Sequence, residues 1–179
     1  MTGYTGGGPS LLVFDGHDGC GKSTLAALTA AELGGQVVKP FSDSLGDHIA
    51  WLWRNERFAD ADRLARSSLE RVREQFPPPL IFDRHWTTMF TVLPEEFWAE
   101  WGELPPTVVC HAATDTVMTR LDSRGEDLGD PQEHDYFNEL YVKLAPMARN
   151  HLVLDTTSVG VEDCLAQVLD FVHRLPSGA

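Results

Sequence analysis

Lysine and arginine are scarce in this sequence. Its 179 residues include 14 Lys and Arg against 27 Asp and Glu, which gives a formal net charge of −13 at pH 7. A surface that wraps nucleic acid or an anionic membrane needs a basic field, so this balance argues against both partners. Any anionic ligand must meet basic residues that are concentrated locally. Only three lysines are present, Lys22, Lys39 and Lys143, and the first two follow short apolar runs.

Cysteine is also rare, and long apolar runs are missing. Cys20, Cys110 and Cys164 are odd in number and lack the spacing of metal ligands, so we expect reduced thiols. No stretch approaches the roughly 20 apolar residues that a membrane span requires. The first residues are rich in glycine but lack the basic flank and apolar run of a signal peptide. These observations predict a cytoplasmic location and no membrane partner.

Short apolar runs alternate with segments of helix-forming residues. A continuous apolar run of this kind is typical of a buried strand in a parallel sheet. The predicted strands are 11–15, 36–39, 80–83, 107–111 and 152–155. The predicted helices are 22–33, 43–56, 60–75, 114–123, 131–149 and 161–175. This alternation predicts an α/β fold of three layers, with helices on both faces of a five-stranded parallel sheet.

A single domain accounts for this pattern. The length and the 42% hydrophobic content are ordinary for one globular domain. We expect a flexible tail at 1–9, where glycine is frequent, and one domain at 10–176, because no internal repeat or linker interrupts it. Within that domain, a glycine-bearing polar loop around 120–131 is expected to form a short lid.

A glycine-rich segment separates the first predicted strand from the first predicted helix. Residues 16–23, GHDGCGKS, match the phosphate-binding loop (P-loop) pattern G-x-x-x-x-G-K-[ST] in the strand-to-helix context that it requires. Glycines let successive N–H groups point at phosphate oxygens beside a helix N-terminus, whereas a turn that binds nothing is the alternative. Lys22 would neutralise the β- and γ-phosphates, and the Ser23 hydroxyl would bind Mg²⁺. The pattern predicts a P-loop NTPase fold with ATP and Mg²⁺ as cofactors.

An Asp-Arg-His triplet follows the third predicted strand. Asp83, Arg84 and His85 would lie at the carboxyl end of that strand, the edge where ligands bind in an open α/β sheet. Asp83 can hold Mg²⁺ through water there, and Arg84 can bind a phosphate through two hydrogen bonds. The alternative is a capping Asp beside a surface Arg, and spacing alone does not separate the two.

Two arginines stand at the start of the polar loop that is expected to form the lid. Arg120 and Arg124 are one helical turn apart and share a helix face. Phosphoryl transfer leaves the protein little covalent work, so mobile arginines that reach the transferring group are a recurrent solution. An ordinary solvated helix end is the alternative.

Together these motifs resemble the thymidylate kinase family in their order and spacing. The resemblance rests on FDGHDGCGKST at 14–24, DRH at 83–85, Arg120 with SRGE at 123–126, the helix from Asp135 to Tyr141, and LDTT at 154–157. It covers almost the whole chain, and its P-loop and DRH elements are specific in combination. It implies a P-loop kinase that transfers the γ-phosphoryl group of ATP to a nucleoside monophosphate, usually as a homodimer.

The resemblance also implies roles for individual residues. Asp18 would lie near the acceptor sugar hydroxyl and Mg²⁺, and Arg84 would hold the acceptor phosphate. Arg63 resembles the arginine that contacts the base in the family. Arg120 would stack on adenine in a pocket that is completed by the loop at 155–158, while Arg124 would reach the phosphates from the lid.

Three sets of site residues follow from the motifs and the resemblance. The catalytic residues are Lys22, Asp18, Arg84 and Arg124. The cofactor-binding residues are Gly16, His17, Asp18, Gly19, Cys20, Gly21, Lys22, Ser23, Thr24, Arg120 and Thr156. The substrate-binding residues are Asp15, Lys39, Phe41, Phe58, Arg63, Asp83, Arg84 and Thr88, and the metal ligands are Ser23 and Asp83.

The acceptor site departs from the family pattern. Where the family has R-E-P-G-G, this chain has KPFS at 39–42, so we expect the acceptor phosphate to meet Lys39. Positions that read the base in the family are apolar here, at Met89 and Val92, and lose the hydrogen bonds that discriminate substrates. Gly19 stands where some members carry a P-loop arginine, so lid arginines must supply that charge. Thymidylate itself is a poor fit, and a modified or unusual pyrimidine nucleotide is the expected acceptor.

Two other functions stay open on the sequence. A kinase of a nucleoside or another small alcohol would not need a second phosphate clamp, and it too would act on a small-molecule acceptor. A nucleotide-binding regulatory protein is a third interpretation. Guanine-specific switches usually carry an N-K-x-D element, however, and no Asn-Lys pair occurs here.

Overall fold

A sheet of five parallel strands, in the order β2-β3-β1-β4-β5, forms the centre of the protein. The structure is a computed structural model that describes residues 9–176. The strands are β1 (Leu11–Asp15), β2 (Gln36–Val38), β3 (Leu80–Asp83), β4 (Thr107–His111) and β5 (His151–Asp155). All five coincide with predicted strands to within one residue at each end. Of the tail expected at 1–9, only Pro9 lies within the described residues.

β1 is buried at every position because it lies between two other strands. Leu11 pairs with Leu80 of β3, and Val13 pairs with Thr107 of β4. A central strand of a parallel sheet is covered on both faces, which explains the continuous apolar run that ends at Asp15. The polar residues that follow β1 and β3 therefore emerge together at the carboxyl edge of the sheet.

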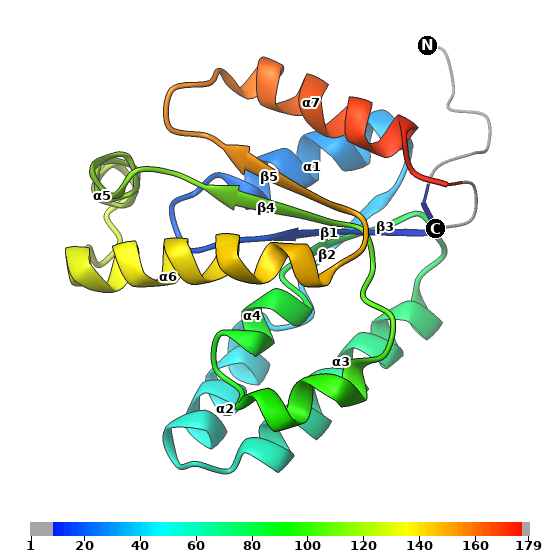
Figure 1. The fold of residues 1–179 in the computed structure, drawn as a ribbon, viewed down its shortest axis with the longest axis vertical. Coiled ribbons are helices and arrows are strands. Elements are labelled where there is room, and N and C mark those ends of the chain that lie inside the picture. Colours follow the sequence, from blue (N-terminus) through cyan, green and yellow to red (C-terminus); the bar gives the residue numbers. More distant parts are fainter. Residues whose placement is uncertain (1–8, 177–179) are drawn as a thin grey trace.

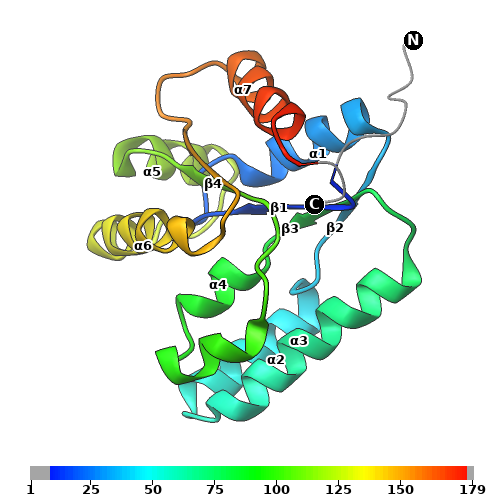
Figure 2. The ribbon, with the colours of Figure 1, turned by 45° about the vertical axis from the view of Figure 1, so that its right-hand side comes forward.

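Helices cover both faces of the sheet (Figure 1). They are α1 (Lys22–Leu33), α2 (Asp43–Arg54), α3 (Phe58–Gln75), α4 (Trp86–Phe90), α5 (Thr114–Ser123), α6 (Pro131–Leu144) and α7 (Val161–His173). α1 and α7 pack together on one face, and α6, α4 and α3 lie on the other, with α2 beside α3 (Figure 2). The predicted three-layer α/β fold is confirmed. None of the helices within residues 9–176 is both long and apolar enough to cross a membrane.

Apolar side chains fill the space on both sides of the sheet. Leu12 and Phe14 of β1 share one cluster with side chains of α1 and α7. On the opposite side, Trp86 of α4 packs in a cluster that includes Ile49 of α2. The Trp86 indole N–H donates to Thr107 Oγ1 at 2.9 Å, which ties this cluster to β4. Apolar clusters thus pack against both faces of the sheet.

Two segments differ from the predicted elements by more than two residues. Residues 86–101, for which no element was predicted, contain α4 and a 3-10 helix, η1 (Glu95–Trp101). Four of the five residues of α4 are buried, so the helix has no polar face whose spacing could predict it. α6 ends at Leu144 and not at 149, and a 3-10 helix, η2 (Ala145–Met147), follows. Pro146 lacks the N–H that would continue the α-helical bonds.

Candidate active site

The P-loop motif at 16–23 joins β1 to α1 at the carboxyl edge of the sheet, with Gly16 to Gly21 in the connecting loop and Lys22 and Ser23 in the first turn of α1. Gly16 has φ +140°, and a Cβ atom there would lie 2.2 Å from the carbonyl oxygen of Cys110. Gly19 has φ +78°, and its Cβ would lie 2.8 Å from Val117 Cγ1. Both positions therefore require glycine, because neither the backbone angle nor the space admits a side chain.

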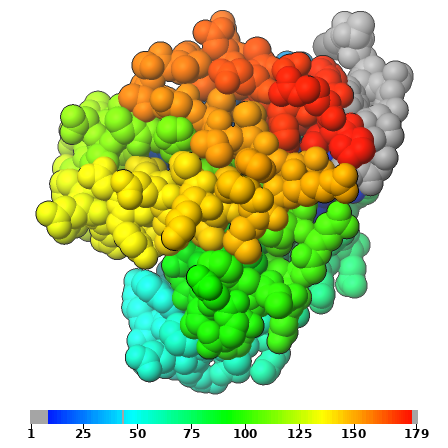
Figure 3. All heavy atoms as spheres, in the orientation of Figure 1, coloured from blue at the N-terminus to red at the C-terminus, as the bar shows by residue number. Residues whose placement is uncertain are grey.

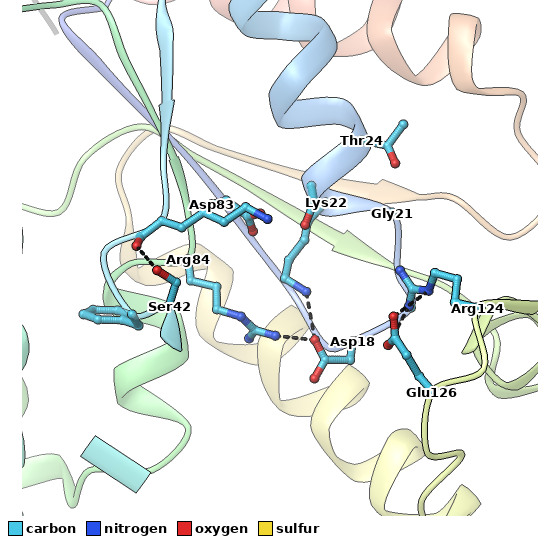
Figure 4. A pocket seen from close by; sticks show the side chains of 13 residues that line it. Asp18, Gly21, Lys22, Thr24, Ser42, Asp83, Arg84, Arg124 and Glu126 are labelled. Carbon is cyan, nitrogen blue, oxygen red and sulfur yellow. Dashed lines mark hydrogen bonds and ion pairs between the residues drawn. The ribbon is translucent and has the colours of Figure 1, made fainter. Parts of the chain in front are cut away.

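Lys22 begins α1 and bends back over the loop (Figure 4). Its side chain is buried, and Nζ donates to the carbonyl oxygen of His17 at 3.3 Å and to Asp18 Oδ1 at 3.2 Å. The ammonium group thus lies beside the concave side of the loop. A P-loop lysine in this place can neutralise the terminal phosphates of a nucleoside triphosphate.

A cavity of about 400 Å³ opens in front of the loop (Figure 4). We call it the phosphate cavity, and its polar walls include Asp18, Lys22, Ser23, Lys39, Asp83 and Arg84. Asp83 is buried at the end of β3, and Lys39 Nζ lies 3.4 Å from its Oδ2 atom. The structure therefore brings together the predicted metal ligands, Ser23 and Asp83, with the lysine that was expected near the acceptor phosphate.

The carboxylates do not form a metal site by themselves. Within the described range 9–176, no group of three or more His, Cys, Asp or Glu side chains is placed to hold a metal ion. Mg²⁺ in phosphoryl-transfer sites is usually held by one or two protein oxygens together with phosphate oxygens and water. Ser23 and Asp83 line the same cavity as Lys22 and so fit an ion that arrives with a triphosphate.

Arg84 lines the phosphate cavity and is bonded to residues on two sides. It has φ +80°, which is rare for a residue with a side chain and is typical of strained functional positions. Its Nη2 atom forms an ion pair with Asp18 Oδ1, and Nη1 donates to the Tyr141 hydroxyl at 3.4 Å. Burial alone would lower the pKa of Arg84, but Tyr141 and nearby carboxylates, led by Asp18, raise it. The guanidinium is therefore always charged.

A second cavity of about 490 Å³ lies between α2, α4 and α6. We call it the acceptor cavity, and Figure 3 shows the surface indented where α6 meets α2. Asp18, Phe41 and Arg84 line both this cavity and the phosphate cavity. Most of its wall is apolar and includes Ile49, Trp53, Met89, Val92 and Phe137. A molecule in this cavity would reach the phosphate cavity past the Asp18–Arg84 ion pair.

A chain of hydrogen bonds runs beneath the acceptor cavity. Arg84 donates to Tyr141, whose hydroxyl lies 3.0 Å from Thr88 Oγ1, and Thr88 donates to Asp15 Oδ1 at 2.5 Å. The backbone N–H of His85 donates to the other Asp15 oxygen at 3.1 Å. Complete burial raises the pKa of Asp15, although the bond from Thr88 and the charge of Arg84 oppose this. Asp15 and Thr88, both predicted to bind substrate, are thus hydrogen-bonded to each other. Each side chain already has hydrogen-bond partners within the protein.

A third cavity, of about 310 Å³, lies on the other side of the P-loop. Its walls include Leu25, Arg120, Thr156, Val159 and Cys164. It adjoins the phosphate cavity through Gly19, Gly21 and Arg124, which line both. A nucleoside attached to a triphosphate in the phosphate cavity could extend into this space.

The loop between α5 and α6 carries Arg124, which is half exposed. Arg124 Nε lies 3.0 Å from Glu126 Oε1, and both side chains line the phosphate cavity (Figure 4). The predicted lid arginine is therefore beside the phosphates' expected position but is paired with a carboxylate of its own loop. It must exchange that partner before it can contact a phosphoryl group.

His134 is a functional candidate that the sequence analysis missed. His17 Nε2 lies 2.6 Å from His134 Nδ1, and His134 Nε2 lies 2.5 Å from the carbonyl oxygen of Leu128 in the loop between α5 and α6. The His17 ring also stacks on Phe137, with ring centroids 5.4 Å apart. Burial lowers the pKa of His17 to about 4, so the His17 ring is neutral near pH 7. The spacing of His134, Phe137 and Tyr141 on one helix face was the available signal.

Phe58 and Arg63 are the predicted substrate-binding residues that the structure does not bring to the site. Phe58, at the start of α3, packs against the apolar cluster around Trp86. Arg63 is largely exposed and lies 3.5 Å from Asp60 on its own helix. Neither residue lines the cavities described above. On this side of the acceptor cavity the aromatic wall is Trp53 of α2.

Comparisons with known proteins show the fold. No protein-family model and no curated protein sequence matches the chain. Among solved structures, deoxyadenosine kinase from M. mycoides, with dCMP and dCDP bound, matches with a TM-score of 0.64 at 13% identity, covering 92% of this chain and 100% of that one. Thymidylate kinase from Candida albicans matches with a TM-score of 0.65 at 14% identity, covering 94% and 93%.

A third similar structure is the YorR protein from Bacillus subtilis in complex with phosphorylated GDP. Its TM-score is 0.58 at 20% identity, and the match covers 91% of this chain and 95% of that one. The shared fold is that of P-loop nucleoside and nucleotide kinases. The predicted P-loop fold, and the resemblance to thymidylate kinase at the level of the fold, are therefore confirmed.

Proposed function

We propose that this protein is a kinase that transfers the γ-phosphoryl group of ATP to a nucleoside monophosphate. The observation that carries the proposal is the wall of Asp18, Phe41 and Arg84 that the phosphate cavity and the acceptor cavity share. Phosphoryl transfer needs a donor phosphate and an acceptor oxygen held in line, with positive charge around the transferring group. Two cavities that meet at an arginine beside a P-loop lysine supply that arrangement.

The donor would be held by the P-loop amides, Lys22 and Ser23. Ser23 and Asp83 would hold the Mg²⁺ that binds with ATP, and this ion would supply further positive charge beside the phosphates. Lys22, which now contacts Asp18, would turn to the terminal phosphates. Arg124 would leave Glu126 to meet charge that develops in the transition state.

The acceptor phosphate would meet Arg84, with Lys39 as the second cation on the phosphate-cavity side. Asp18 is ionised, so its carboxylate can accept a hydrogen bond from a hydroxyl of the acceptor sugar. The hydrogen bonds that join Asp15, Thr88 and Tyr141 would hold the Arg84 side chain in position, because Arg84 donates to Tyr141. Each of these residues acts by binding and orienting, which is most of what this chemistry asks of a protein.

The acceptor base would be held mainly by apolar contact. Thr88 and Tyr141 already bond to each other, and Thr91 donates to the carbonyl oxygen of Thr88 at 2.8 Å. The side-chain amides that usually read a base edge are missing from the described wall. Shape, set by Trp53, Met89 and other apolar residues, would therefore select the base, which suits a modified or unusual pyrimidine.

A nucleoside or another neutral alcohol is the second candidate acceptor, and one observation favours it. Arg84 is the only lysine or arginine among the residues described as lining the acceptor cavity, and it is already paired with Asp18. A neutral acceptor could bind without breaking that ion pair. A homodimer and a cytoplasmic location stay predictions that follow from the sequence analysis.

Consumption of ATP should be measured with Mg²⁺ against nucleoside monophosphates, nucleosides and small alcohols. We expect the highest kcat/KM with a nucleoside monophosphate. Turnover with nucleosides alone would favour the second candidate, and no turnover above that of Lys22→Ala with any acceptor would contradict a kinase. The same panel, run with different bases on one sugar phosphate, tests selection by shape.

A further inference from the structure

Two side chains from outside the P-loop motif hold the P-loop from behind. Arg120 comes from α5, and Thr156 comes from the turn after β5. Arg120 Nη1 donates to the carbonyl oxygen of Gly19 at 3.1 Å and to Thr156 Oγ1 at 3.0 Å. Arg120 Nη2 donates to the carbonyl oxygen of Thr156 at 2.6 Å. Both terminal nitrogens of the guanidinium therefore donate hydrogen bonds to protein oxygens.

Thr156 holds the next carbonyl group of the loop, that of Cys20. Its hydroxyl accepts from Arg120 and donates to the carbonyl oxygen of Cys20 at 2.8 Å, while the carbonyl oxygen of His111 lies 3.2 Å away. The Thr156 N–H donates to the same His111 oxygen at 2.9 Å. The residue is buried and fixed to the end of β4, so it is a rigid support for the P-loop.

These bonds decide which way the loop amides point. In a trans peptide the C=O and the N–H of the next residue point in opposite directions. Bonds that hold the carbonyl oxygens of Gly19 and Cys20 on the outer side therefore direct the N–H groups of Cys20 and Gly21 toward the concave side. There the Cys20 nitrogen now lies 3.5 Å from the carbonyl oxygen of His17, a long contact that a phosphate oxygen can replace.

We infer that Arg120 and Thr156 are positioning residues that set the direction of the P-loop amides. The inference rests on the proposed use of the P-loop as a triphosphate site and does not depend on the acceptor. The faces of the Arg120 guanidinium take no part in these bonds, so the stacking on adenine that the family resemblance implies stays compatible with it. The inference adds that Arg120 and Thr156 support phosphate binding, whether or not the ligand carries a base.

A ligand without a base tests this role directly. Binding of Mg²⁺-ATP and of Mg²⁺-tripolyphosphate should be measured by calorimetry in wild type, Thr156→Val and Arg120→Met. We expect both variants to bind both ligands about tenfold more weakly, the change that corresponds to one lost hydrogen bond of ordinary strength. A role confined to adenine predicts weaker ATP binding with unchanged tripolyphosphate binding, and that result would overturn the inference.

Two matched variants serve as controls. Thr156→Ser keeps the hydroxyl and should bind tripolyphosphate within about threefold of wild type, and failure of this rescue would count against the hydroxyl. Thr119→Val removes the neighbouring exposed hydroxyl, which donates to the carbonyl oxygen of Asp115, and should leave binding unchanged. Melting temperatures identify any variant that does not fold. If Thr156→Val is one, Arg120→Met decides, because Arg120 is only partly buried.

The kinase proposal fails by a different result. Wild-type protein that binds tripolyphosphate but turns over no ATP with any acceptor would contradict the kinase and leave the positioning role intact. Wild-type protein that binds no tripolyphosphate would overturn the positioning role together with its premise.

Discussion

Asp18 lies between two cations, Lys22 and Arg84, at the meeting point of the phosphate and acceptor cavities. Burial opposes its ionisation, but Arg84 and Lys22 outweigh this effect and hold the pKa of Asp18 at about 2. The carboxylate is therefore anionic at physiological pH and forms an ion pair with each of the two cations. In the proposed reaction, the phosphates of the substrates would compete with Asp18 for Lys22 and Arg84. The ion pairs with Asp18 would hold these two side chains at the cavities until the phosphates replace the carboxylate.

Lys22→Ala should lower kcat by about 10²-fold or more, because loss of a charge that stabilises the transferring group has effects of that size. The fold should survive, since the Lys22 ammonium contacts, within residues 9–176, only a loop carbonyl and Asp18. Steady-state kinetics and circular dichroism measure the two effects. Lys143→Ala, an exposed lysine on α6, is the control, and a Lys22→Ala variant with more than about a tenth of wild-type kcat would refute the assignment.

Gly19 leaves the P-loop without an arginine, and Val117 closes the space that a side chain would need there. Arg124→Ala should therefore lower kcat by about 10²-fold with little change in the KM for ATP, as expected for a contact made mainly in the transition state. Initial rates at saturating acceptor test this. Arg174→Ala, which removes an exposed arginine from the end of α7, is the control. A rise in the KM for ATP at constant kcat would instead place Arg124 in ground-state binding.

At the scale of elements, α2 and α4 form the wall of the acceptor cavity, while α3 lies behind α2. Trp53 of α2 lines the cavity, and Phe58 of α3 packs in the apolar cluster behind it. The turn between the two helices separates these aromatic residues by only a few positions along the chain. Their different surroundings predict different defects on truncation.

Trp53→Ala should raise the KM for the acceptor about tenfold and leave the KM for ATP unchanged, because it removes apolar contact from one cavity only. Phe58→Ala is the matched variant and should lower the free energy of unfolding by about 2 to 4 kcal/mol, with an unchanged KM for the acceptor. Chemical denaturation and steady-state kinetics read out both variants. If Phe58→Ala changes the KM and Trp53→Ala does not, the base lies against α3, as the family resemblance implied.

The elements that were predicted from sequence are those with a local signal. The strands, the P-loop and Asp83-Arg84 follow from apolar runs and from the rule that ligands meet the carboxyl edge of the sheet. α4 and η1 were not predicted. α4 is nearly all buried and has no polar face whose spacing could indicate a helix. The His17–His134 contact joins residues 117 positions apart, which no local pattern reveals. Phe58 and Arg63 were assigned by resemblance alone, and the placement of α3 separates them from the cavities.

At the scale of the whole molecule, the half-buried His17 and the buried His85 make the free energy of unfolding depend on pH in the acid range. Burial lowers the pKa of His17 to about 4, and burial with the charge of Arg73 lowers that of His85 to about 3, from an ordinary value of 6.5. As the pH falls below 6.5, the unfolded chain binds protons at these rings and the folded protein does not. Stability is therefore lost from pH 6.5 downward, until the folded-state pKa values are reached, and is unaffected by these groups above about pH 7.5.

His85→Phe should remove part of this acid sensitivity. Each such histidine contributes up to about 1.4 kcal/mol per pH unit, so the loss of stability between pH 7 and 5 should be smaller by up to about 2 kcal/mol in the variant. The His85 ring contacts the rings of Phe82 and Trp101, so Phe keeps an aromatic ring among them and removes the titrating nitrogens. Urea denaturation at both pH values measures the difference, with His48→Phe at an exposed site as the control. Equal losses in His85→Phe and wild type would show that His85 titrates normally.

The wall that the phosphate and acceptor cavities share has a stereochemical consequence for the proposed reaction. With Asp18 and Arg84 lining both spaces, donor and acceptor can occupy the protein together and face each other across a single gap. The phosphoryl group then passes once, directly, and a chiral γ-thiophosphate would be inverted at phosphorus. By the same geometry, one molecule that joins a nucleoside to the end of an adenosine polyphosphate would fill both cavities at once and act as a bisubstrate inhibitor.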